Sequence, residues 1–143
     1  MLSIVNAIPH QLHKRTTNFG KCTLPPKAPT PDLLTVTISP DPVVPGKNDT
    51  FTVNGKLTKP ITSSDELVIV FANTSGIIGD IFRTKLPTGT VKVSVTENVP
   101  VPFSLPSDYR IGVAIVDPSF EPPDVKACAV AFVGSPPPSH DAL

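Results

Sequence analysis

The sequence predicts an all-β sandwich of about seven short strands. Several separate segments alternate apolar and polar residues at period two, and no helical period competes with them. Turn residues interrupt these segments roughly every 8 to 16 residues, which is typical of all-β sandwiches. The 19 prolines among 143 residues argue against a mainly helical chain, because interior proline breaks a helix. Hydrophobic residues make up 39%, which is enough to build a core.

The first half of the chain contains three predicted strands. Residues 34–38 carry Leu, Val and Ile on one face, and prolines at 40, 42 and 45 end this strand. Residues 50–57 alternate in the same way, with Phe51 and Val53 on the apolar face. Residues 67–71 (LVIVF) are continuously apolar, which predicts a strand covered on both faces.

The second half continues the pattern. Residues 76–80 are expected to turn the chain, and a short strand is expected at residues 81–82. Residues 91–96 alternate Val with polar residues, and residues 109–115 carry Tyr, Ile and Val on one face. The last strand is predicted over residues 125–133, so that the apolar faces of all these strands can form the core between two sheets.

The two ends of the chain are predicted to lie outside the domain, which spans residues 16–134 with strands from about 33. Residues 1–15 (MLSIVNAIPHQLHKR) combine a small-residue cleavage pattern with a dibasic pair, which predicts a truncated signal peptide and propeptide of a secreted protein. The alternative is a polar N-terminus with a chance Lys-Arg pair. Residues 135–143 are predicted to be a disordered proline-rich tail. Sequons make Asn48 and Asn73 candidates for glycosylation.

Few side chains in this chain can perform chemistry. Twelve basic residues balance twelve acidic ones without blocks of like charge, which argues against a nucleic-acid partner. The histidines, at positions 10, 13 and 140, all lie in the predicted tails, so that neither a hydrolase triad nor a zinc site can be assembled. We therefore expect no enzyme, no cofactor and no metal. The remaining enzymatic alternative, a carboxylate pair of Asp117 and Glu121, has the character of solvated loop charges.

Two cysteines, Cys22 and Cys128, bracket the predicted strands. A single pair in a secreted domain suggests one disulfide. It would close a loop of roughly a hundred residues and stabilise the fold by about 4–5 kcal/mol in the chain-entropy model, often less in practice. The alternative is two free buried thiols.

Three segments have a familiar order and spacing. They are residues 38–47 with 51–55 (ISPDPVVPGK and FTVNG), residues 101–111 (VPFSLPSDYRI) and residues 127–133 (ACAVAFV). Together they resemble ML lipid-recognition domains over residues 22–133, especially the fungal phosphatidylglycerol/phosphatidylinositol transfer proteins and the Niemann-Pick-type sterol-transfer proteins. The resemblance implies an immunoglobulin-like β-sandwich that encloses an apolar cavity between its sheets.

The same resemblance implies a function. It suggests a secreted lipid-binding or lipid-transfer protein, or one in a vacuole-like or lysosome-like lumen, that carries a sterol or a phospholipid. We expect a monomer that makes transient contact with membrane surfaces. The cysteines occupy the places of the family's first and last cysteines, which are paired. The family's other cysteine pairs are absent, and the segment between Phe71 and Val91 that would flank the pocket mouth is short.

Apolar strand residues are the candidates for the pocket lining: Phe51, Val53, Ile69, Phe71, Val93, Val95, Ile111, Val113, Val130 and Phe132. Phe82, Val101 and Phe103 are candidates for the pocket mouth, because they lie in loops or at strand ends. Lys85 and Lys92 are candidates for contact with a phospholipid head group.

A packed core needs the same residue types as an empty pocket. Small residues in the last strands would leave space for a ligand or would allow close packing: Gly112, Ala114, Ala127, Ala129 and Ala131. The competing function is therefore an immunoglobulin-like secreted interaction module without a ligand pocket.

Overall fold

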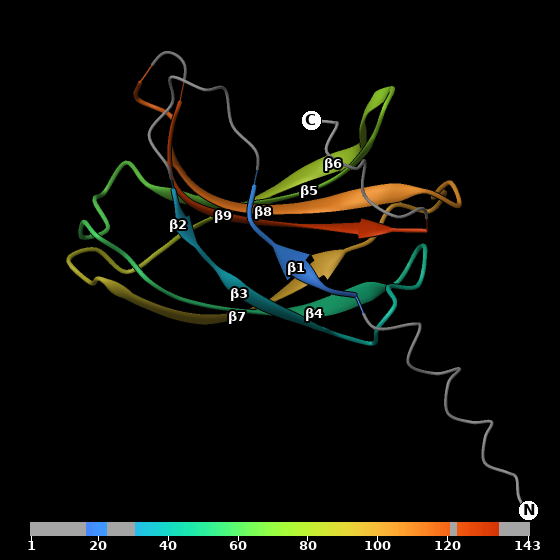
Figure 1. The fold of residues 1–143 in the computed structure, drawn as a ribbon, viewed down its shortest axis with the longest axis horizontal. Helices are drawn as coiled ribbons and strands as arrows, with labels where there is room; N and C mark the ends of the chain where they lie inside the picture. The colour runs from blue at the N-terminus through green and yellow to red at the C-terminus, as the bar shows by residue number, and fades with distance from the viewer. Residues whose placement is uncertain (1–16, 23–30, 121–122, 135–143) are drawn as a thin grey trace, which may run out of the picture.

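Two β-sheets pack face to face in the computed structural model, which describes residues 17–22, 31–120 and 123–134 (Figure 1). The described residues form nine strands and no helix, so the predicted all-β sandwich is confirmed. Seven of these strands have five residues or more. The predicted segments 1–15 and 135–143 lie outside the described residues. No helix in the described chain is long and apolar enough to cross a membrane.

The larger sheet has six strands in the order β1–β9–β8–β5–β6, with β2 also on β9. Its long strands pair antiparallel, whereas β2 runs parallel to β9. The strands are β1 (Phe19–Gly20), β2 (Asp32–Leu33), β5 (Glu66–Asn73), β6 (Gly76–Lys85), β8 (Tyr109–Asp117) and β9 (Asp124–Val133). Strand β6 is therefore one edge of this sheet.

The smaller sheet has the antiparallel order β3–β4–β7. Its strands are β3 (Thr35–Ser39), β4 (Asn48–Lys56) and β7 (Lys92–Pro100). Alternate residues of β4 are buried, and Phe51 and Val53 are fully inaccessible. Period-two alternation thus puts one face of this sheet against the larger one, as the sequence predicts.

The core lies between the sheets. Phe51 of β4 meets Phe71 of β5 edge to face, with ring centroids 6.4 Å apart. The ring centroid of Tyr109 in β8 lies 6.3 Å from that of Phe71. The contact between Phe51 and Phe71 joins the two sheets at their inner faces, where side chains of most long strands form one hydrophobic cluster.

The prediction of a turn at residues 76–80 is wrong. The chain turns earlier, at Thr74–Ser75, and β6 runs without interruption from Gly76 to Lys85. Gly79 supplied part of the turn signal, but it lies inside the strand with φ of 71°. The adjacent prediction for residues 67–71 also needs correction, because Val68 and Val70 are only half-buried on the outer face of the sheet.

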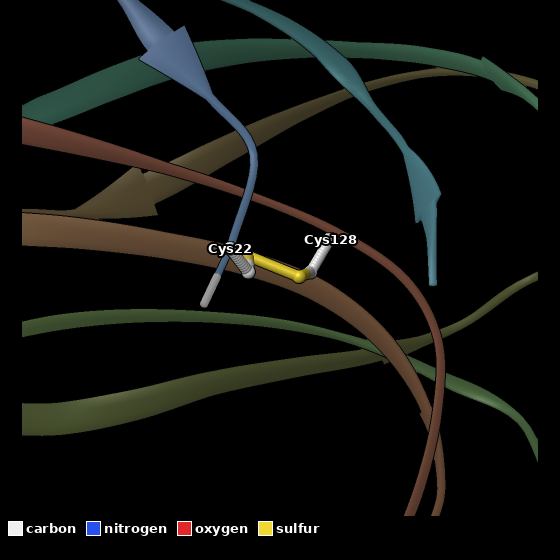
Figure 2. The surroundings of a disulfide bond; sticks show 2 residues. All are labelled: Cys22 and Cys128. Carbon is white, nitrogen blue, oxygen red and sulfur yellow. A yellow bond between two sulfur atoms is a disulfide. The ribbon is translucent and has the colours of Figure 1, made fainter. Parts of the chain in front are cut away.

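Cys22 and Cys128 form a disulfide, as predicted, with their Cα atoms 6.1 Å apart. Figure 2 shows how the bond joins the chain just after β1 to β9. The pair is separated by 106 residues in sequence. The bond therefore fixes the N-terminal end of the described chain to the last strand.

Candidate apolar site

An apolar pocket of about 430 Å³ lies at one edge of the sandwich. Residues 78–82 of β6 form one wall, and residues 100–104, which begin at the last residue of β7, form the other. Most of the lining is aliphatic, aromatic or proline, and Asp80 and Ser104 add polar groups. The pocket thus lies where the edge strands of the two sheets, β6 and β7, approach each other.

A β-bulge in β6 shapes the first wall. Ile69 and Phe71 of β5 pair with Phe82 and Ile78, so that three residues of β6 lie opposite one residue of β5. Such a bulge bends the strand and re-aims its side chains. Gly79 allows the bend through its positive φ, and it also lets the walls approach each other, because a Cβ there would lie 3.0 Å from Cγ of Pro102.

Hydrogen bonds to a neighbouring loop hold the second wall. The amide of Gly46 donates to the carbonyls of Val101 and Pro102, at 3.2 and 3.0 Å. The amide of Val101 donates to the carbonyl of Lys47 at 2.9 Å. The ring of Phe103 extends beside Gly46 and remains 90% exposed. This wall is consequently rigid at its base and carries a solvent-exposed aromatic ring at its tip.

All three residues predicted for a pocket mouth line this one pocket. Phe82 comes from the edge strand, while Val101 and Phe103 come from the segment after β7. Val101 is buried and Phe82 is half-buried. The sequence missed Ile78 and Ile81 as lining residues, because their segment was expected to be partly a turn.

Most of the predicted lining residues lie elsewhere, in the core between the sheets. Seven are at most 4% exposed and pack within the hydrophobic cluster: Phe51, Val53, Ile69, Phe71, Val93, Ile111 and Val113. Val95 is half-buried and packs against the same cluster. The side chains chosen for an inter-sheet cavity therefore fill the space between the sheets.

The prediction that Val130 and Phe132 face the inter-sheet space is wrong. In β9 the inward residues are Ala127, Ala129 and Ala131, all fully buried. Val130 is half-buried and Phe132 is 40% exposed, on the opposite face of the sheet. Both phases of this strand are apolar, so its alternation could not reveal which one faces the core.

These outward residues belong to a second apolar pocket, of about 460 Å³, on the outer face of the larger sheet. Val68 and Val70 of β5 contribute to it together with Val130 and Phe132 of β9. Gly112 and Ala114 of β8 also line it, and their small size leaves a hollow between the outer strands. The small residues of the last strands are thus divided between a close-packed inner face and this outer depression.

The lysines predicted for a head group line neither of these pockets. Lys85 donates to the carbonyl of Ser63 at 3.2 Å and lies 3.8 Å from a carboxylate oxygen of Glu66. Lys92 begins β7, at the opposite end of that strand from Pro100. The structure therefore does not bring these lysines to the mouth residues.

The sequon asparagines occupy different surroundings. Asn48 is exposed at the start of β4. Asn73 is half-buried at the end of β5, where its Oδ1 accepts a hydrogen bond from the amide of Ser75 at 2.8 Å. Glycosylation of either residue stays a prediction.

Asp117 is not a solvated loop charge as expected, because it is buried at the end of β8. Its carboxylate accepts hydrogen bonds from the amide of Ser119 at 3.0 Å and from the Ser119 hydroxyl at 2.6 Å. The hydrogen bond from that hydroxyl is the main reason why the pKa of Asp117 lies below its ordinary value. Glu121 lies outside the described residues. Within the described ranges, no group of three or more His, Cys, Asp or Glu side chains is placed to hold a metal ion.

Asp49 carries an acidic carboxyl group in a buried position. It is 1% exposed, and neither carboxylate oxygen has a hydrogen-bond partner among the residues that the structure describes. Burial, and secondarily the charge of Asp41, raise its pKa from 3.8 to about 6. The pKa of Tyr109 is also raised, first by burial and then by the negative charges of Asp41 and Asp49. The sequence contained the signal, because Asp49 is in phase with the buried Phe51 and Val53.

Comparisons with protein-family models and with curated proteins found no match for this chain.

Proposed function

We propose that this protein binds a lipid, either a sterol or the acyl part of a phospholipid, in the pocket between β6 and residues 100–104, and that it transfers this lipid between membranes. The observation that carries the proposal is the meeting of Phe82, Val101 and Phe103 around one apolar pocket. The expectation that Phe82 lies in a loop or at a strand end is wrong, because it lies inside β6, and Val101 is buried in the core. Phe103 is 90% exposed, and a ligand site would give this apolar ring a reason.

The size and chemistry of the pocket support this proposal. Its volume of about 430 Å³ falls within the roughly 300–1,000 Å³ that is common for small-molecule sites. Burial of apolar ligand surface yields about 25 cal/mol per Å², so a lipid needs no charged partner for affinity. Asp80 and Ser104 are available to orient a hydroxyl or another polar group.

The location of the pocket supports delivery from a membrane. Phe103 is 90% exposed, and an aromatic ring at such a position can enter the interface of a bilayer. Because the same ring lines the pocket, transient contact with a membrane would bring lipid to the mouth. The disulfide is compatible with secretion or with a vacuole-like or lysosome-like lumen, where oxidising conditions preserve such bonds.

Two matched variants test the proposal. Binding of a fluorescent sterol and extraction of phospholipid from vesicles are measured for the wild type, Phe103→Ala and Phe132→Ala. Each substitution removes a phenylalanine ring from one of the two pockets. We expect Phe103→Ala to weaken binding about tenfold, which corresponds to loss of about 1.4 kcal/mol, and Phe132→Ala to leave it unchanged.

Other outcomes have definite meanings. Loss of binding only in Phe132→Ala would move the lipid site to the outer face of the larger sheet. Absence of binding to either lipid class would contradict the proposal. It would favour the second candidate function, an immunoglobulin-like interaction module, which is supported by the filled space between the sheets.

A further inference from the structure

Asp49 lies in the interior, where no described group is placed to balance a negative charge on its carboxylate. It is the second residue of β4 and shares the inner face with Phe51 and Val53. Both carboxylate oxygens are inaccessible, and neither has a hydrogen-bond partner within the described part of the chain. An ionised carboxylate is costly in such a place, and buried polar groups without partners are rare enough to require an explanation.

The groups around Asp49 favour its neutral form. The titratable groups that interact electrostatically with this corner of the described chain are Asp41 in the loop before β4 and Tyr109 at the start of β8. The facing residue on β7 is Val99, which is apolar and buried. Asp41 itself is held by Thr17, whose amide donates to its carboxylate at 2.8 Å. Asp49 therefore faces another acid and apolar side chains, which together oppose its ionisation.

The same residue lies at the base of the second pocket wall. Asp49 and Asn48 pair with Val99 and Pro100, the last residues of β7, where that wall begins. The preceding residues of the chain hold the wall directly, through the hydrogen bonds from Gly46 to Val101 and from Val101 to Lys47. A change of charge at Asp49 therefore acts within two or three residues of the contacts that position the pocket.

We propose that Asp49 is a proton-operated latch for this wall. When Asp49 is neutral, the Gly46–Lys47 loop and the Val101–Phe103 segment stay packed. When it is ionised, the buried charge draws water into this corner and loosens both segments. The proposal rests on the proposed function in one respect, namely that the wall belongs to a lipid site, so that lipid is held under acidic conditions and exchanged at neutral pH.

The direction of the pH effect follows from the titration. The pKa of Asp49 is about 6 in the folded protein and 3.8 when unperturbed. Between these values the folded state keeps a proton that the unfolded state has released, so stability falls as the pH rises through this window and is constant above it. A difference of about two pKa units corresponds to a factor of up to roughly a hundred in the unfolding equilibrium. Solvent near the end of the sandwich reduces this factor.

The test compares the wild type with Asp49→Asn, which is always neutral and has nearly the same shape. Hydrogen exchange at the amides of Gly46 and Val101 is followed from about pH 4 to about pH 7.5 for both proteins. We expect the ratio of wild-type to variant opening to rise by about ten- to a hundredfold over this range. A ratio that does not change with pH overturns the proposal. Any constant cost of burying the asparagine amide cancels in this comparison.

A second measurement needs no variant. The carboxyl carbon of Asp49 in the wild-type protein should titrate by NMR with a midpoint near 6. A midpoint at or below the ordinary value of 3.8 overturns the latch, even if Asp49→Asn fails to fold.

Lipid binding at the same pH values separates the two proposals. A pH-dependent exchange ratio in a protein that binds no lipid supports the latch and contradicts the proposed function. Lipid binding with a constant exchange ratio supports the function and contradicts the latch.

Discussion

Substitution of Gly79 by alanine tests whether the narrow contact between the two pocket walls braces the site. Gly79 has φ of 71°, and a Cβ there would lie 3.0 Å from Cγ and 3.2 Å from Cβ of Pro102. A left-handed conformation costs a residue with a side chain about 1–2 kcal/mol. Displacing the proline ring, which lies on a hydrogen-bonded segment, adds the roughly 1–3 kcal/mol typical of overpacking. We therefore expect Gly79→Ala to lower the free energy of unfolding by about 2–5 kcal/mol.

Gly89 provides a matched control. Its φ is 85°, but a Cβ there would meet no atom within 4 Å. Gly89→Ala should therefore cost only the backbone contribution of about 1–2 kcal/mol. The difference between the two variants isolates the contact with Pro102, and urea unfolding with linear extrapolation measures it.

The lipid titration completes this experiment. Gly79→Ala pushes Pro102 and the neighbouring mouth residues outward, so we expect weaker lipid binding in this variant and unchanged binding in Gly89→Ala. Equal losses of stability in the two variants would refute the idea that the bulge and Pro102 form a tight contact. Unchanged lipid binding in Gly79→Ala would show that this contact does not shape the site.

Two further predictions concern the frame around the site. Replacing Cys22 and Cys128 together by alanine should lower the free energy of unfolding by about 2–4 kcal/mol, because the bond closes a loop with a sequence separation of 106. Urea unfolding, with the m-value determined separately for each protein, would detect the loss. No change would mean that the bond does not stabilise the fold. Lys126→Met should cost about 3–5 kcal/mol, because it leaves the fully buried Asp65 carboxylate without its ammonium partner at 2.8 Å. Adding Asp65→Asn to that variant should restore part of the loss, and a double variant as unstable as the sum of the single ones would exclude coupling between the two side chains.

The alternation of apolar residues was sufficient to predict the sandwich and most of its core. Where only one phase of a strand is apolar, as in β4, the prediction was confirmed, because a polar side chain cannot be turned toward the core without cost. In β9 both phases are apolar, and Val130 and Phe132 were the residues expected to face inward. The alanines face inward instead, and Val130 and Phe132 line the outer pocket.

Glycine was the other source of error. Gly79 was interpreted as part of a turn, although its positive φ serves a bulge inside β6. A turn and a bulge need the same backbone freedom, so the residue type alone does not distinguish them. The consequence was functional as well as structural, since Ile78 and Ile81 line the pocket from this part of the strand.

By itself, the sequence determined the fold class, the inward face of most strands and the disulfide pair. These depend on periodicity and on the number of cysteines, which are local or compositional properties. Only the tertiary structure decided that most predicted lining residues pack into the core between the sheets, that an apolar pocket lies at the edge beside β6, and that Asp49 has no hydrogen-bond partner among the described residues. Each of these depends on how side chains distant in sequence meet, and packing and burial are set by those contacts.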